Sequence, residues 1–124
     1  MTAKRILVID DEEDIREVAQ LSLEMVGNWE VLTAGSGREG LAVAAAELPD
    51  AILLDVMMPD LDGPSTFEKL QENPRTRNIP VILLTAKMQA ADKRRFERLG
   101  VNGVIAKPFD PMTLAEQVAE ALQP

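Results

Sequence analysis

The sequence of 124 residues contains no cysteine and no histidine. Without cysteine, disulfides, thiolate zinc sites and cysteine nucleophiles are excluded. Without histidine, the chain lacks the usual general base and the ligand of most transition-metal sites. Tyrosine is absent too, and one Trp and three Phe are too few for a platform that stacks nucleic-acid bases. Any chemistry must therefore use oxygen ligands, a hard cation or a carboxylate nucleophile.

Long hydrophobic runs are also missing. The longest, residues 41–46, has six residues, so we expect neither a membrane-spanning helix nor a signal-peptide core, and a cytoplasmic protein is the default. Acidic residues outnumber basic ones by 21 to 13, which argues against direct binding of nucleic acid. The exception is a basic cluster, which is either a solvated helix face or a surface for an acidic partner: Lys93, Arg94, Arg95 and Arg98.

Short apolar runs alternate along the chain with segments of helical spacing. The apolar runs predict strands at 6–9, 30–34, 51–54, 81–84 and 103–106. The first helical segment has apolar residues at Ile15, Val18, Ala19, Met25 and Val26, with Gly27 as its stop. The fourth spans about 89–99, and the last begins at Asp110 as N-cap with Pro111 as the first helical residue.

This alternation predicts a (βα)5 chain that forms one domain over residues 1–124. Strands separated by helices pair in parallel through right-handed crossovers, so we expect a flavodoxin-like α/β sandwich of three layers. The expected strand order is 2-1-3-4-5. In such sheets the functional site lies beyond the carboxyl ends of the strands, where the order reverses between the first and the third strand.

The predicted strand ends carry a charged or hydroxyl side chain in four separate places. They are Asp10 and Asp11, Asp55, Thr85 and Lys107. Two carboxylates about 5 Å apart repel by roughly 3 kcal/mol at an effective dielectric near 20, so three of them need a compensating charge. Mg²⁺, which takes carboxylates, waters and a phosphate oxygen, is the obvious candidate. Each residue alone has an ordinary structural explanation, but their convergence from four strands favours phosphate chemistry.

Four segments carry a resemblance to a known family. They are V-I-D-D-E at 8–12, L-L-D-V-M-M-P-D-L-D-G at 53–63, L-T-A at 84–86 and K-P-F at 107–109. In these segments, and over essentially its whole length, the chain resembles the receiver domains of two-component response regulators, especially single-domain regulators of the chemotaxis type. The resemblance implies a domain that receives a phosphoryl group, in a Mg²⁺-dependent reaction, from a histidine kinase or a phosphotransfer protein.

The resemblance also implies a role for each matching residue. Asp55 would be the phosphoacceptor and a metal ligand, Asp11 a direct Mg²⁺ ligand, and Asp10 a ligand directly or through water. The backbone carbonyl of Met57 would complete the protein's share of the metal site. Because the chain has no histidine, it cannot be the phosphohistidine donor.

Beyond the metal site, the resemblance implies that Thr85 and Lys107 bind phosphoryl oxygens, and that the Lys107–Pro108 bond is cis. One position departs from the family. Receivers commonly carry an aromatic residue three positions before the lysine, which swings inward on activation; here that residue is Val104. Phosphorylation is not affected by this difference, but the aromatic switch cannot operate. The response would then pass through the fourth helix and the loop before it, and the basic cluster would lie on the family's partner surface.

Two alternatives stay open. Gly35, Gly37 and Gly40 match the G-x-G-x-x-G pattern of dinucleotide-binding domains, with Asp55 at a suitable distance, although a loop of small residues that admits a helix explains them as well. A flavin would find few aromatic side chains for stacking. The second alternative is a small Mg²⁺-dependent phosphatase with an aspartyl nucleophile. Such enzymes of the haloacid dehalogenase type carry an acid/base Asp two residues after the nucleophile, where this chain has Met57.

Overall fold

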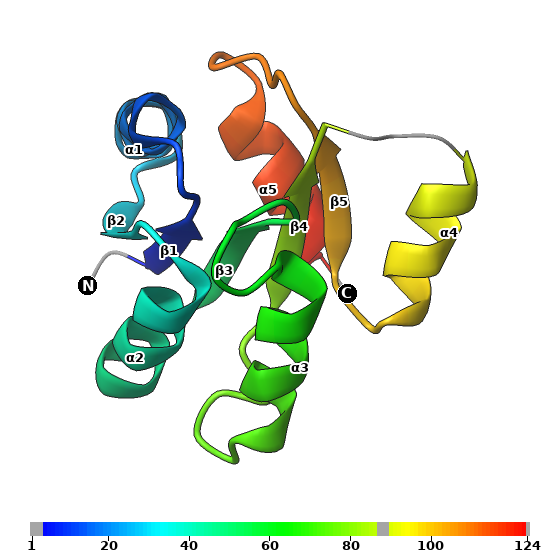
Figure 1. The fold of residues 1–124 in the computed structure, drawn as a ribbon. Coiled ribbons are helices and arrows are strands. Elements are labelled where there is room, and N and C mark those ends of the chain that lie inside the picture. Colours follow the sequence, from blue (N-terminus) through cyan, green and yellow to red (C-terminus); the bar gives the residue numbers. More distant parts are fainter. Residues whose placement is uncertain (1–3, 87–89, 124) are drawn as a thin grey trace.

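The computed structural model describes residues 4–86 and 90–123, with only the main chain at 90, 91 and 93. A central parallel sheet has the order β2-β1-β3-β4-β5, as predicted (Figure 1). Its strands are β1 (Arg5–Ile9), β2 (Glu30–Ala34), β3 (Ala51–Asp55), β4 (Val81–Thr85) and β5 (Gly103–Ala106). The helices are α1 (Glu13–Gly27), α2 (Gly37–Glu47), α3 (Gly63–Glu72), α4 (Ala90–Arg98) and α5 (Leu114–Leu122).

The sheet separates two hydrophobic cores. Leu7 and Ile9 of β1 point to the side of α2, α3 and α4, where Phe67 and Phe96 are buried. Ile6 and Val8 point to the opposite side, where α1 and α5 pack (Figure 1). The three central strands are buried on both faces, which explains why their sequences are continuous apolar runs rather than alternating patterns. The fold is therefore the predicted three-layer α/β sandwich.

Local side-chain chemistry defines the starts of α2 and α3. The Ser36 hydroxyl accepts a hydrogen bond from the Glu39 N–H at the start of α2. The Asp62 carboxylate does the same for the Ser65 N–H at the start of α3. After α4, Gly100 has φ of +95°, a left-handed conformation that glycine adopts without strain.

The predicted start of the last helix was wrong, and α1 buries fewer of its apolar residues than their helical spacing suggests. Helix α5 begins at Leu114, not at Pro111, because the Asp110 carboxylate accepts the Met112 N–H and closes a separate turn before the helix. In α1 the buried side chains are Ala19, Ser22 and Leu23, whereas three of the apolar residues at helical spacing are exposed. Those three are Val18, Met25 and Val26, with exposed fractions of 39%, 79% and 48%. Two adjoining faces of α1 are apolar, and only one of them meets the sheet.

Candidate functional site

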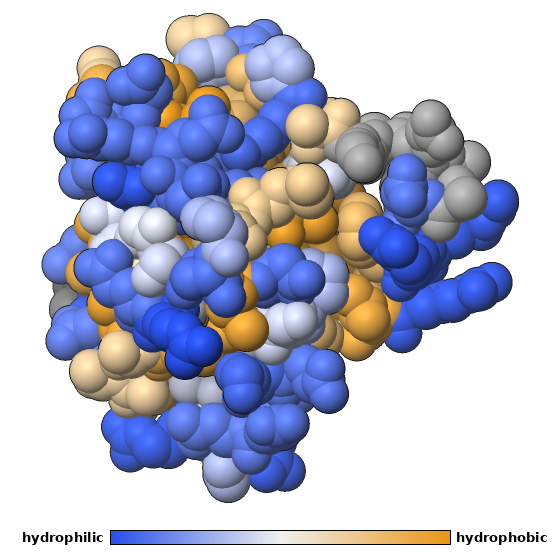
Figure 2. Space-filling model, viewed as in Figure 1, coloured by the Kyte–Doolittle hydropathy of each residue, from blue (hydrophilic) through white to orange (hydrophobic). Residues whose placement is uncertain are grey.

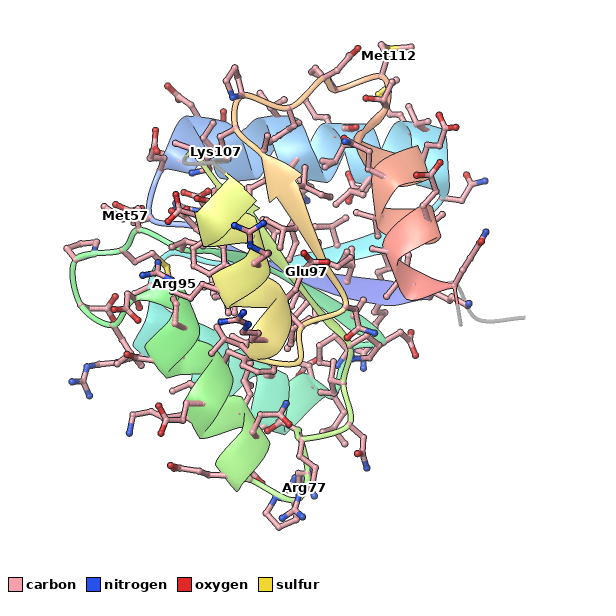
Figure 3. The ribbon with its side chains drawn as sticks, turned by 90° about the vertical axis from the view of Figure 1, so that its right-hand side faces the viewer. Met57, Arg77, Arg95, Glu97, Lys107 and Met112 are labelled. Atoms are coloured by element: carbon pink, nitrogen blue, oxygen red, sulfur yellow. The ribbon has the colours of Figure 1, made fainter. Side chains whose placement is uncertain are left out.

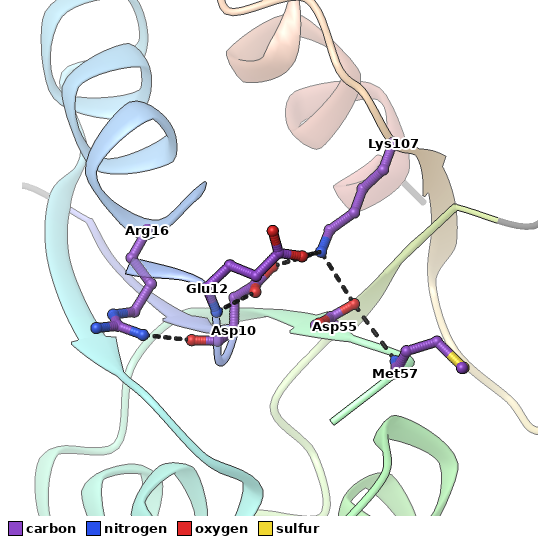
Figure 4. Close-up of polar contacts among 6 residues, drawn as sticks. All are labelled: Asp10, Glu12, Arg16, Asp55, Met57 and Lys107. Atoms are coloured by element: carbon purple, nitrogen blue, oxygen red, sulfur yellow. Dashed lines mark hydrogen bonds and ion pairs between the residues drawn. The ribbon is translucent and has the colours of Figure 1, made fainter. Parts of the chain in front are cut away.

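The predicted site residues lie at one end of the sheet. Asp10 directly follows β1, Asp55 ends β3, Thr85 ends β4 and Lys107 follows β5. Figure 3 shows Met57 and Lys107 at this same end, and Figure 4 shows Asp10 and Asp55 on either side of the Lys107 ammonium. The parallel sheet thus brings together side chains that are up to about a hundred residues apart in the sequence.

Three carboxylates form the acidic pocket of the site. Asp10, Asp11 and Asp55 each offer an oxygen, and these oxygens lie within 4.8 Å of one another. Asp10 and Asp55 are buried, whereas Asp11 is exposed and borders solvent. One buried carboxylate oxygen, Oδ2 of Asp55, accepts no hydrogen bond from the part of the chain that the structure describes. A hard divalent cation binds closely spaced carboxylate oxygens, including a buried one that accepts no hydrogen bond. The residues of the pocket therefore fit Mg²⁺.

Lys107 is the cation of the pocket. Its Nζ lies 2.8 Å from Oδ2 of Asp10 and 3.2 Å from Oδ1 of Asp55. A third and longer contact, 3.5 Å, joins it to Oε1 of Glu12, whose side chain is largely exposed. Burial by itself would lower the pKa of Lys107, but hydrogen bonding to Asp10 and the charges of Asp10 and Asp55 outweigh it and raise that pKa. The ammonium therefore stays protonated between the two buried carboxylates.

The Asp55 carboxyl titrates far from its ordinary range. Burial first, and then the charge of Asp10, raise its pKa from 3.8 to about 6, against the lowering effects of Lys107 and the Met57 N–H. That N–H donates to Oδ1 of Asp55 over 3.4 Å. Burial and the neighbouring Asp10 together therefore outweigh the stabilising effect of the Lys107 charge on the ionised carboxyl.

The first turn after β1 is fixed by contacts that the sequence did not predict. The Asp10 carboxylate accepts the Glu12 N–H over 2.9 Å, and its main-chain carbonyl accepts Nη1 of Arg16 over 2.7 Å (Figure 4). The main-chain N–H of Asp10 donates to the carbonyl of Ala34 in β2. Glu12 stands within the quoted D-D-E segment and Arg16 one turn later, but nothing in the spacing singles out either contact.

Thr85 and Lys107 are joined through the main chain. Thr85 is buried, pairs with Ala106 of β5, and accepts the Lys107 N–H at its carbonyl over 2.8 Å. The Lys107–Pro108 peptide bond is cis, as predicted. Val104 lies opposite Leu83 in the sheet and packs against the core on the side of α4. At position 104, where the resemblance leads us to expect an aromatic ring, the chain therefore has a short side chain that packs against the core.

The glycine-rich turn before α2 is a packing device. A Cβ on Gly40 would lie 2.4 Å from Cδ1 of Ile9, and one on Gly37 would lie 2.5 Å from Oγ1 of Thr66. The N-terminus of α2, where a dinucleotide phosphate would bind, already holds the Asp60 carboxylate, which accepts the N–H groups of Gly37 and Arg38. The geometry thus favours a loop of small residues that admits the helix.

The basic cluster lies on α4. Arg94, Arg95 and Arg98 are exposed, and the guanidinium of Arg95 stands 4.9 Å from the centre of the Phe96 ring. The side chain of Lys93, the fourth member, lies outside the described residues. Figure 2 shows a hydrophilic surface over α4 at the right of the view. Within residues 4–86 and 90–123, no helix is long and apolar enough to cross a membrane.

Comparison with known proteins agrees with this geometry. Residues 6–119 match the family described as the response regulator receiver domain. The chain is 40% identical over 120 residues to the Bacillus subtilis alkaline phosphatase synthesis transcriptional regulatory protein PhoP, covering 97% of this chain and 49% of that protein. It is 44% identical over 116 residues to the Caulobacter vibrioides response regulator PleD, covering 92% of this chain and 25% of that protein. The chain thus spans half or less of these curated relatives.

Solved structures show the same likeness over the whole fold. The Vibrio cholerae chemotaxis response regulator CheY4 superposes with a TM-score of 0.90 at 30% identity, covering 98% of this chain and 100% of that one. A putative response regulator from Chloroflexus aurantiacus gives a TM-score of 0.88 at 32% identity and covers 98% of each chain. The chain therefore belongs to the receiver domains of two-component response regulators.

Proposed function

We propose that residues 1–124 form a receiver domain that takes a phosphoryl group onto Asp55 in a Mg²⁺-dependent reaction. The donor is the phosphohistidine of a histidine kinase or a phosphotransfer protein. The observation that carries the proposal is the acidic pocket: three carboxylates within 4.8 Å, closed on one side by Lys107 at 3.2 Å from Asp55. Receiver domains as a class interact with histidine kinases and downstream effectors. Phosphoryl transfer requires charged groups around the phosphoacceptor, and the acidic pocket supplies them at Asp55.

In this transfer Asp55 is the nucleophile. One oxygen of its carboxylate forms the new bond to phosphorus as the phosphorus–nitrogen bond to the donor histidine breaks, and the imidazole leaves with that electron pair. The buried position of Asp55 keeps bulk water away from the acyl phosphate that results. Attack by water on this acyl phosphate later returns Asp55 to its free carboxylate and ends the signal.

The surrounding residues compensate the charge of the phosphoryl group. Asp10, Asp11, Asp55 and the Met57 carbonyl would hold Mg²⁺, which, when bound, neutralises negative charge on the phosphoryl oxygens. Lys107 is already within ion-pair distance of Asp55, so a small displacement of its ammonium would form an ion pair with the oxygens of the phosphoryl group on Asp55. The Thr85 hydroxyl, from the end of β4, supplies a hydrogen bond to the phosphoryl group.

Turnover of an external phosphate ester is not expected. A phosphatase with an aspartyl nucleophile needs an acid to protonate the leaving alcohol. Two residues after Asp55 stands Met57, whose exposed side chain carries no proton for this purpose. The phosphoryl group therefore remains on Asp55 as a signal rather than as a catalytic intermediate.

Phosphorylation changes the conformation of the face that contains α4, and this face contacts the downstream partner. The side chain of Val104 has no ring to swing, so the response must come from displacement of α4 and the loop before it. Phe96 is buried at 2% exposure and anchors this helix, while Arg94, Arg95 and Arg98 lie outside on the same helix. Together with Lys93, these arginines suit a protein partner with an acidic surface. We propose no contact with nucleic acid or membrane, and a cytoplasmic location.

A small phosphodonor tests the proposal without knowledge of the kinase. Incubation with acetyl phosphate and Mg²⁺ should add one phosphoryl group per chain by intact-mass spectrometry, and the same incubation in EDTA should add none. The adduct should be lost on brief treatment with alkali, as acyl phosphates are. Labelling that does not depend on Mg²⁺, or an adduct stable to alkali, would contradict the proposed chemistry.

A further inference from the structure

The loop between β3 and α3 carries Met57, and its two ends are fixed by different contacts. At its base, the Gly63 N–H donates to the Val56 carbonyl over 2.9 Å. A Cβ on Gly63 would lie 2.6 Å from the carbonyl oxygen of Asp55 and 2.8 Å from Cα of Val56, so only glycine fits where α3 starts against the phosphoacceptor. The base of the loop is therefore held tightly to β3.

At its tip, the loop is tied to a different helix. Oδ1 of Asp60 accepts the Gly37 N–H over 3.2 Å, and Oδ2 accepts the Arg38 N–H over 3.1 Å. Both donors belong to the first turn of α2, which lies beside α3 on the same side of the sheet (Figure 1). The hydrogen bond from Arg38 lowers the pKa of Asp60, burial opposes it, and the hydrogen bond from Gly37 adds to the lowering, so the carboxylate is ionised at neutral pH.

The junction between the loop tip and α2 is closely packed. A Cβ on Gly37 would lie 2.7 Å from the carbonyl oxygen of Leu61, so the helix meets the loop main chain without an intervening side chain. The buried Thr66 hydroxyl donates to the Asp62 carbonyl over 2.8 Å and fixes the loop on its other side. A carboxylate that accepts two N–H groups across such a junction constrains the loop in position and in orientation.

We propose that Asp60 is a positioning residue for the metal site: it ties the loop to α2 and so holds the main chain of Met57 against Asp55. The inference rests on the proposed function, in which the Met57 carbonyl is a metal ligand. The Met57 N–H, 3.4 Å from Oδ1 of Asp55, shows that the loop already contacts the phosphoacceptor carboxylate. The buried Met58 side chain and the Thr66 hydroxyl, which donates to the Leu61 carbonyl, also hold this segment, and Asp60 adds the hydrogen bonds that fix its tip to α2.

Ser36 provides a control at the same helix end, because its hydroxyl accepts the Glu39 N–H within α2. Asp60→Ala removes two hydrogen bonds from the first turn of α2 and Ser36→Ala removes one, but only the Asp60 bonds join the helix to the loop. A second control, Asp62→Asn, removes one negative charge from the same loop while keeping a side chain that caps α3 equally well. The three variants separate positioning from helix capping and from net charge.

The experiment measures the dissociation constant of Mg²⁺ by calorimetry, and amide exchange of residues 56–62 in the metal-free protein. Asp60→Ala should weaken Mg²⁺ binding about tenfold, the low end of the effect of residues that orient metal ligands. It should also speed exchange at Met57, whereas Ser36→Ala and Asp62→Asn should leave both values near those of the wild type. If Asp60→Ala does not fold, Asp60→Asn, which keeps one acceptor oxygen, should show the same changes at smaller size.

Two results would overturn the inference while the proposed function stands. In the first, the Asp60 variants bind Mg²⁺ as tightly as the wild type. In the second, Ser36→Ala weakens binding as much as Asp60→Ala does, which would make helix capping the cause. If the wild-type protein itself binds no Mg²⁺, the proposed function fails first and the inference with it.

Discussion

Replacing Asp55 by asparagine should stabilise the protein when no metal is bound. The carboxyl is buried, and its pKa is raised from 3.8 to about 6, first by burial and then by Asp10. Such a rise is equivalent to about 3 kcal/mol between the two protonation states. The asparagine side chain of the Asp55→Asn variant keeps the shape of the protonated carboxyl and avoids that cost. We therefore expect its free energy of unfolding to exceed that of the wild type by about 3 kcal/mol at pH 7.5 in EDTA.

The advantage should depend on pH in a defined direction. Below pH 3.8 the carboxyl is protonated in both the folded and the unfolded wild type, and the variant gains nothing. Between pH 3.8 and about 6, the unfolded chain releases the proton while the folded chain keeps it, so wild-type stability falls as the pH rises. Above about pH 6 the free energies of unfolding of the variant and the wild type should differ by the full amount. A gain of about 3 kcal/mol corresponds to an increase in Tm of about 10 °C for a domain of this size.

Urea unfolding at several pH values measures this difference. Trp29, partly buried against the core beneath α1 and α5, reports unfolding by its fluorescence and lies outside the acidic pocket. Asp62→Asn serves as the control, since asparagine caps α3 as well as aspartate does and should change stability little at any pH. An Asp55→Asn variant that is no more stable than the wild type at pH 7.5, or equally more stable at pH 4 and 7.5, would refute the electrostatic reasoning.

The charges and the hydroxyl of the same pocket lead to three further predictions. Mg²⁺ at about twenty times its dissociation constant should stabilise the wild type by about 1.8 kcal/mol, seen as a rise of several degrees in Tm at fixed ionic strength, and Asp11→Asn should weaken that response. Lys107→Met leaves two buried carboxylates without their cation and should lower the free energy of unfolding by about 3 kcal/mol in urea at pH 7.5. Thr85→Ala should still accept a phosphoryl group on Asp55, but amide exchange of α4 should then respond less to beryllofluoride; an unchanged response of α4 would exclude Thr85 from the route.

The sequence predicted which residues meet at one edge of the sheet, because the parallel sheet imposes that placement. Each of Asp10, Asp55, Thr85 and Lys107 comes at the end of a short apolar run, and parallel strands must place those ends along one edge. The strand order and the cis bond before Pro108 were also predicted correctly. The strand order depends on local patterns and on the connectivity of the chain, whereas the cis bond was implied by the resemblance to receiver domains.

What the sequence did not predict depends on contacts between side chains far apart in the chain. Helix α1 has two adjoining apolar faces, and periodicity alone cannot tell which one packs on the sheet. Asp110 has the side chain of an N-cap, yet it closes a separate turn over residues 111–113, directly before α5. Arg16 donates to the Asp10 carbonyl, and the Asp60 carboxylate accepts the N–H of Gly37 in α2; both hydrogen bonds form only when neighbouring strands and helices are in place.

The most direct test of the account locates the phosphoryl group. After reaction with acetyl phosphate and Mg²⁺, borohydride converts an aspartyl phosphate to homoserine, and peptide mass spectrometry then identifies the modified residue. We predict homoserine at position 55 alone in the wild type, and no conversion in Asp55→Asn, a variant that remains folded. Conversion at Asp10, Asp11 or any other carboxyl group instead, or equal labelling of the Asp55→Asn variant, would contradict the assignment of Asp55 as the phosphoacceptor.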